Sequence, residues 1–167
     1  PMGDANSPAG RLRSGGLTVE LTTDEGITGV APGGTGSRAL IHSMCEGLLA
    51  GEDPRRVTGL WQKMVGKVFK GGHDGLVNDA ISALDVALWD LKAKWNREPL
   101  WKTLGGARPR VLGYASGLEM PLPDQQVYDW YSMMATKHGF KGGKLKVGVD
   151  QDMDLRRIGK MQDALSQ

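Results

Sequence analysis

The sequence contains one cysteine, no long apolar run and no leader-like segment. With Cys45 alone, no disulfide can form within the chain, and its place on the apolar side of a helical pattern favours a packing role over a nucleophilic one. No stretch reaches the apolar length of a membrane span, and the first residues lack a charged segment followed by an apolar one. These absences predict a soluble, cytoplasmic protein without a membrane partner.

Concentrated positive charge is also missing. The net charge is +2, both signs are interspersed, and no extended run of lysines and arginines offers a surface to phosphate groups. The sequence therefore excludes nucleic acid as the leading partner.

Motifs for nucleotides and metals are weak. The segment GTGSRA from Gly34 has the spacing of a dinucleotide-binding loop, but the strand before it belongs to a hairpin rather than to a strand-helix-strand unit. The three histidines, His42, His73 and His138, show no metal-ligand spacing with one another. A surface or packing role is the better interpretation of each.

The apolar pattern of the first half predicts a hairpin followed by helices. Residues 17–22 alternate apolar and polar side chains, and a turn at 24–26 precedes a second run from Ile27, which together predict a β-hairpin with one buried face. The helical spacing of Leu40, Ile41, Met44, Leu48 and Leu49 then predicts a helix that stops at Gly51.

Two further helices follow. Asp53 is expected to cap a helix with Pro54 in its first position, and residues 76–95 carry the strongest helical pattern of the chain. Aspartates on this long helix are interpreted as a salt-bridge face rather than a catalytic carboxylate group, because Asp90 and Lys94 have the favourable i,i+4 order.

The pattern changes after about residue 108, where strands and helices alternate. Segments 111–116 and 143–147 are predicted strands, and segments 124–138 and 150–165 are predicted helices. The inward side of the second helix is expected to carry Met153, Leu155, Ile158, Met161 and Leu165. Such alternation predicts parallel strands with right-handed crossovers, as at the start of an α/β sheet or barrel.

We therefore expect an N-terminal α+β domain over 1–108 and the first part of a second domain over 109–167. The chain starts without an initiating methionine and stops after a helical pattern with no closing strand. It is expected to be a piece of a longer protein.

Two lysines lie unusually close together on one of the predicted strands. In KLKV, Lys144 and Lys146 flank Leu145, so their side chains share one face of the strand. Lysines often protect edge strands, which favours a non-functional interpretation for the pair alone. In a parallel sheet covered on both faces, however, the pair would face a barrel interior, where a lysine beside another cation is suited to act as a general base.

The segments TVELTTDEGITGVA, ISALDVALWDLKAKWNREPLWKTLGG and GFKGGKLKVG, in this order, resemble the enolase superfamily, specifically its mandelate-racemase-like branch. The resemblance covers nearly the whole chain. It implies an α+β capping domain, here lacking its first strand, followed by the start of a (β/α)7β TIM-like barrel.

By this resemblance, Lys146 would remove the α-proton of a substrate carboxylate bound to Mg2+, and Lys144 would contact that carboxylate. Ser116, at the end of the first barrel strand, matches a position where relatives hydrogen-bond the substrate. The family's carboxylate metal ligands come from the third, fourth and fifth barrel strands. This chain is therefore expected to hold no metal ligand, with the Mg2+ site formed beyond its end.

The capping-domain loop expected to cover the site is residues 1–16, and it is polar. Asn6 and Arg13 are its candidate substrate-binding residues, since each substrate hydroxyl buried without a partner would cost about 1 to 3 kcal/mol. This loop, together with further likeness to talarate/galactarate-type dehydratases, predicts a lyase that removes water from a small-molecule acid sugar. A homo-oligomer is expected.

Two alternatives stay open. A racemase or epimerase of a 2-hydroxy acid would share Lys146 and return the proton to the opposite face. A non-catalytic fragment that associates through its exposed sheet edge is the second, because the metal ligands lie outside the sequence.

Overall fold

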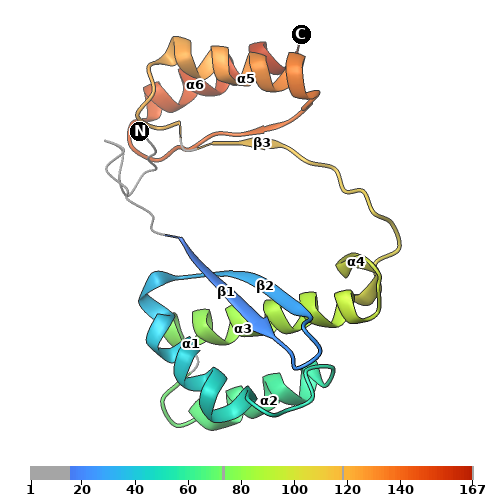
Figure 1. The fold of residues 1–167 in the computed structure, drawn as a ribbon. Coiled ribbons are helices and arrows are strands. Elements are labelled where there is room, and N and C mark those ends of the chain that lie inside the picture. The colour runs from blue at the N-terminus through green and yellow to red at the C-terminus, as the bar shows by residue number, and fades with distance from the viewer. Residues whose placement is uncertain (1–15, 73, 118, 167) are drawn as a thin grey trace. The chain divides into compact units, whose positions relative to one another are not determined.

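A computed structural model describes residues 16–72, 74–117 and 119–166 (Figure 1). These residues fall into two compact units, one within 15–109 and the other over 110–167. No helix among the described residues has the length and apolar content to span a membrane.

The first unit opens with the predicted β-hairpin. Strand β1 (Leu17–Thr22) pairs antiparallel with β2 (Thr28–Gly33), in a register that sets Val19 opposite Ala31. These two side chains are buried, at 6% and 1% exposure, while their strand neighbours face outward. The hairpin prediction is confirmed.

Helices cover the hairpin. After a short 3-10 turn η1 (Thr35–Ser37) come α1 (Arg38–Met44) and a π-helical turn η2 (Cys45–Leu49), which together occupy the predicted first helix. Cys45 is half-buried and packs against the core, which agrees with a packing role. Burial raises the pKa of its thiol.

The second helix starts later than predicted. Helix α2 (Val57–Val68) begins three residues after Pro54 rather than at it. The side chain of Asp53 accepts hydrogen bonds from the backbone N–H of Arg55 at 3.0 Å and from its guanidinium at 2.8 Å, and so stabilises a turn before the helix. The expectation that Asp53 caps α2 was wrong, because Arg55 takes the carboxylate instead.

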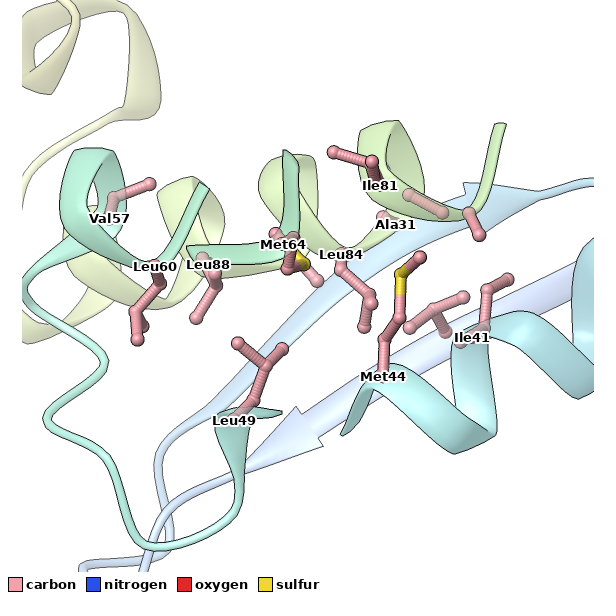
Figure 2. Close-up of a cluster of buried hydrophobic side chains, with 14 residues drawn as sticks. Ala31, Ile41, Met44, Leu49, Val57, Leu60, Met64, Ile81, Leu84 and Leu88 are labelled. Atoms are coloured by element: carbon pink, nitrogen blue, oxygen red, sulfur yellow. The ribbon is translucent and has the colours of Figure 1, made fainter. Parts of the chain in front are cut away.

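Helix α3 (Gly75–Trp95) confirms the strongest prediction and organises the core of this unit. One face packs on β2 while α1 and α2 pack alongside it, and Figure 2 shows where their side chains meet. A short helix α4 (Leu100–Thr103) follows. The core side chains labelled in Figure 2 are Ala31, Ile41, Met44, Leu49, Val57, Leu60, Met64, Ile81, Leu84 and Leu88.

Strand β2 approaches α3 most closely at Gly29. A Cβ atom at this position would overlap the carbonyl oxygen of Ala87 and would lie 2.7 Å from Leu91 Cβ. Since these are backbone and near-backbone atoms of a packed helix, they cannot move aside cheaply.

Gly29→Ala is therefore expected to destabilise this unit by about 1 to 3 kcal/mol or more. Gly66 offers a matched control, because it lies inside α2 with nothing within 4 Å of a new Cβ atom. Gly66→Ala is expected to stabilise the unit by about 0.5 to 1 kcal/mol, because alanine is the better helix former. Denaturant unfolding measures both, and equal effects would contradict the close approach.

Two aspartates of α3 fasten β2 to the helix. Asp90 accepts the backbone N–H of Val30 at 2.8 Å and pairs with Lys94 at 2.7 Å, while Asp79 accepts the backbone N–H of Gly34 at 3.1 Å. The Lys94 pair was predicted as part of a salt-bridge face. The backbone contacts show that these carboxylates also satisfy an N–H group of the strand, at Val30, and one directly after it, at Gly34.

The second unit alternates strand and helix as predicted. Strand β3 (Ala115–Ser116) is followed by α5 (Asp124–His138), β4 (Gly143–Lys144) and α6 (Gln151–Leu165), and β3 and β4 are parallel (Figure 1). Helix α5 ends at Gly139, whose φ of 73° favours glycine.

Both strands are shorter than predicted, at 2 residues each. A strand is defined by its hydrogen-bonded neighbour, and the described residues of this unit offer β3 and β4 only each other. Val111 and Leu112, which were predicted to belong to the first strand, are 92% and 98% exposed. No closed barrel forms among residues 110–117 and 119–166.

The inner face of α6 also differs from its prediction. Leu155 is 60% exposed, whereas Arg157 and Ala164 are 3% and 0% exposed. Helical spacing placed Leu155 inward, but Arg157 is the buried side chain instead. The carbonyls of Met120 and Leu122 accept hydrogen bonds from its guanidinium there.

Candidate functional site

The candidate site lies at the ends of β3 and β4. The parallel register pairs Ser116 with Lys144, so these residues lie side by side on neighbouring strands. Both are exposed, and Lys146 is half-buried two residues further on. Three of the predicted site residues are thus brought together. The other two, Asn6 and Arg13, lie outside the described residues.

The lysine segment, residues 143–148, packs on the helices of its unit through the residue between the two lysines. Leu145, between the lysines, joins the cluster formed by α5 and α6. Gly143 allows this close packing, because a Cβ atom there would lie 2.7 Å from both the Met161 sulfur and the Tyr131 ring. Leu145 therefore lies on a packed side, as the alternation predicted. The shared face of Lys144 and Lys146 stays a prediction, since β4 ends at Lys144.

Glu119 is a site residue that sequence reasoning missed. It is 2% exposed, and its Oε1 accepts the backbone N–H of Lys146 at 2.8 Å. Gly117 leaves room for this carboxylate, since a Cβ atom there would lie 3.0 Å from Glu119 Oε2. The available signal was a lone carboxylate shortly after the strand that carries Ser116, in an otherwise apolar stretch.

Tyr131 of α5 binds the backbone of the same segment. Its hydroxyl donates to the backbone carbonyl of Lys144 at 2.8 Å and lies 3.4 Å from Glu119 Oε1. Its ring meets Trp130 edge-on, with centroids 4.6 Å apart. Burial, followed by the charge and hydrogen bond of Glu119, raises the pKa of Tyr131, so the hydroxyl stays a donor across the physiological range.

Asp154 of α6 fixes the end of the lysine segment. Its Oδ2 accepts the backbone N–H of Gly148 at 2.7 Å. Gly148 has a φ of 112°, which L side chains rarely adopt, so glycine is required where the chain turns toward α6.

Arg157 anchors the loop that carries Glu119. Its Nε donates to Asp124 at 2.9 Å, its Nη1 to the carbonyl of Met120 at 3.0 Å, and its Nη2 to the carbonyl of Leu122. The hydrogen bond from Arg157 is the largest influence that lowers the pKa of Asp124, and burial opposes it. The guanidinium thus ties α6 to the start of α5 and to the turn before it.

Metal binding does not fit the described part of the chain. No group of three or more His, Cys, Asp or Glu side chains there could hold an ion. Glu119 and Asp154 instead direct an oxygen each to backbone N–H groups. We therefore assign no metal ligand among the described residues.

Comparison with known proteins identifies the family. Residues 13–105 match the family described as "Mandelate racemase / muconate lactonizing enzyme, N-terminal domain". The chain is 33% identical over 156 residues to 3,6-anhydro-alpha-L-galactonate cycloisomerase of Streptomyces coelicolor, and this covers 89% of the chain and 43% of the relative.

Two solved structures share the fold. A racemase from Streptomyces coelicolor A3(2), with bound magnesium, has a TM-score of 0.80 and 32% identity, over 89% of this chain and 43% of that one. L-talarate/galactarate dehydratase from Salmonella typhimurium LT2, liganded with Mg and L-lyxarohydroxamate, has a TM-score of 0.79 and 30% identity, over 99% of this chain and 45% of that one. The chain therefore spans less than half the length of these relatives.

Proposed function

Because this chain belongs to the mandelate racemase / muconate lactonizing enzyme family of the enolase superfamily, and forms its α+β N-terminal capping domain, we propose that it serves the Mg2+-dependent dehydration of an acid sugar. Lys146 is the base in this proposal. The observation that carries it is the position of Ser116, Lys144 and Lys146 together at the ends of two parallel strands.

The proposed chemistry starts at the carbon next to the substrate carboxylate. The neutral amine of Lys146 takes the α-proton, and the electrons of the C–H bond move into the carboxylate to give an enediolate. The ammonium group of Lys144 lies beside that carboxylate and offsets the developing charge. The β-hydroxyl then leaves with a proton as water, and the enol tautomerises to a 2-keto-3-deoxy acid.

Two parts of the proposal extend beyond the described residues. The units β3-α5 and β4-α6 are the first two strand-helix units of a (β/α)7β barrel, which supplies the Mg2+ ligands and the acid. Asn6 and Arg13 contact the substrate hydroxyls from the loop over the site. The similarity to the magnesium-bound structures supports the barrel and its Mg2+ ligands, and the contacts of Asn6 and Arg13 stay predictions from the sequence.

An acid sugar is proposed as substrate because of the relatives. L-lyxarohydroxamate, bound with Mg in the Salmonella dehydratase structure, is an acid-sugar analogue. The exposed hydroxyl of Ser116, beside Lys144, suits a substrate with many hydroxyl groups. The protein is proposed to act as a homo-oligomer.

A second function is isomerisation, as a racemase, epimerase or cycloisomerase. It is favoured by the names of the Streptomyces coelicolor relatives, a cycloisomerase and a racemase. This reaction shares the proton removal by Lys146 and differs in the later fate of the enediolate. Product analysis separates the two functions.

The test is incubation of the protein that includes the complete proposed barrel with a panel of aldarates and aldonates in D2O, with Mg2+ and with chelator. Dehydration is expected to produce a 2-keto-3-deoxy acid from one or a few substrates, in the presence of Mg2+ only. Isomerisation would incorporate α-deuterium without a keto acid. An absence of both, together with stable self-association and no Mg2+ binding, would contradict the enzyme proposal and favour the non-catalytic alternative.

A further inference from the structure

Two carboxylates, the buried Glu119 and the half-buried Asp154, flank the end of the lysine segment. Glu119 binds the N–H group of Lys146, and Asp154 binds that of Gly148. Among the residues that the structure describes, the buried side-chain atoms without a hydrogen-bond partner are Glu119 Oε2 and Asp154 Oδ1. Both unpaired atoms thus belong to carboxylates that hold the main chain next to the proposed base.

An unpaired carboxylate oxygen lowers the stability of the folded state, so stability does not explain why these carboxylates are present. A buried carboxylate oxygen loses its water, and a carboxylate at the 2% exposure of Glu119 recovers that loss only through hydrogen bonds. An apolar side chain of similar length would avoid the unpaired oxygen. Glu119 therefore provides one strong acceptor at a fixed position, although its second oxygen has no hydrogen-bond partner.

We propose that Glu119 is a positioning residue for the proposed base: by holding the backbone N–H of Lys146, it fixes where the side chain of Lys146 starts. The catalytic part of this inference rests on the proposed function. Lys146 lies beyond the last paired residue of β4, and no strand of the described residues pairs with its N–H. Glu119 supplies a charged acceptor for it at 2.8 Å.

The surrounding contacts make Glu119 a rigid holder. Tyr131 approaches Glu119 Oε1 and binds the carbonyl of Lys144. Arg157 binds the carbonyl of Met120, directly after Glu119. The acceptor is thus fixed from both α5 and α6, and a rigidly placed base needs less reorganisation for proton transfer.

Two variants separate positioning from the mere presence of a carboxylate. Glu119→Gln keeps an oxygen acceptor of the same length, whereas Glu119→Leu leaves the partly buried N–H of Lys146 without this acceptor. With Glu119→Leu, we expect amide hydrogen exchange at Lys146 to accelerate roughly 10- to 100-fold. The kcat of α-deuterium incorporation is expected to fall roughly 10- to 100-fold with KM nearly unchanged. Glu119→Gln is expected to stay within roughly threefold of wild type in both measurements.

The controls address folding and charge. Asp129 lies exposed on α5, where it accepts a hydrogen bond from the side chain of Gln125 at 2.9 Å, so Asp129→Leu is expected to leave both readouts unchanged. If Glu119→Leu does not fold, Glu119→Asp decides instead. It keeps the charge but withdraws the acceptor by one methylene, and is expected to accelerate Lys146 exchange roughly tenfold.

The outcomes distinguish this inference from the proposed function. An unchanged Lys146 amide in the folded Leu or Asp variant would overturn the positioning role. So would a fall in kcat that is equally large for Glu119→Gln and Glu119→Leu, since the Gln variant retains the acceptor. Absence of α-proton exchange in the wild-type protein would contradict the proposed function. The amide hydrogen exchange of Lys146 in wild type and variants would then still test whether Glu119 fixes this N–H.

Discussion

Lys146→Ala is expected to abolish the exchange of the α-proton of an aldarate with solvent deuterium. In the proposed mechanism the amine of Lys146 is the group that takes this proton, and alanine leaves no base at that place. General bases contribute roughly 100- to 10,000-fold to rate, so the loss should reach at least that range. The measurement is deuterium incorporation at the α-carbon, followed by NMR, in wild type and variant.

Two lysines of the same segment serve as comparisons. Lys141 is exposed and lies before β4, so Lys141→Ala is expected to leave exchange unchanged. Lys144→Ala removes the proposed partner of the carboxylate and is expected to raise KM as well as lower kcat. Unchanged exchange in Lys146→Ala would contradict the assignment of the base, whichever reaction follows.

Arg157→Met is expected to destabilise the unit over residues 110–167 by about 1 to 3 kcal/mol or more. The substitution removes a guanidinium that is 3% exposed, and it leaves the carbonyls of Met120 and Leu122 without this donor and Asp124 with Arg156 alone. The free energy of opening should be measured by amide hydrogen exchange in α5 and α6, because these amides report on this unit directly.

Arg156 provides the matched control. Its Nε also lies near Asp124, at 3.4 Å, but its side chain is 60% exposed. Such exposed pairs contribute about 0 to 1 kcal/mol, so Arg156→Met should change the opening free energy by no more than that. A similar loss in both variants would show that burial of Arg157 is not what matters.

The same contact predicts a pH dependence. Arg157 lowers the pKa of Asp124 in the folded state, so the folded state binds a proton less readily than the unfolded chain does. The stabilisation is therefore fully present above the unfolded pKa of about 3.9 and is lost as pH falls through the lower folded value. The difference between wild type and Arg157→Met should accordingly shrink below about pH 4, and a constant difference down to pH 2 would contradict the linkage.

The hairpin, the long helix α3 and the helices α5 and α6 were all predictable, because each shows its own period of apolar residues. The start of α2 was not. Pro54 and Asp53 form a plausible helix start by local rules, but Arg55 competes for the carboxylate and delays the helix to Val57.

By itself, the sequence determined which segments become strands and helices, and it predicted that Leu145 packs inward between Lys144 and Lys146. These features depend on neighbours a few residues away. Only the tertiary structure decided that Glu119 holds the N–H of Lys146, 27 residues away, and that Arg157 reaches Asp124 across 33 residues. No periodic pattern connects residues so far apart, because such contacts are set by how α5, α6 and the strand ends pack together.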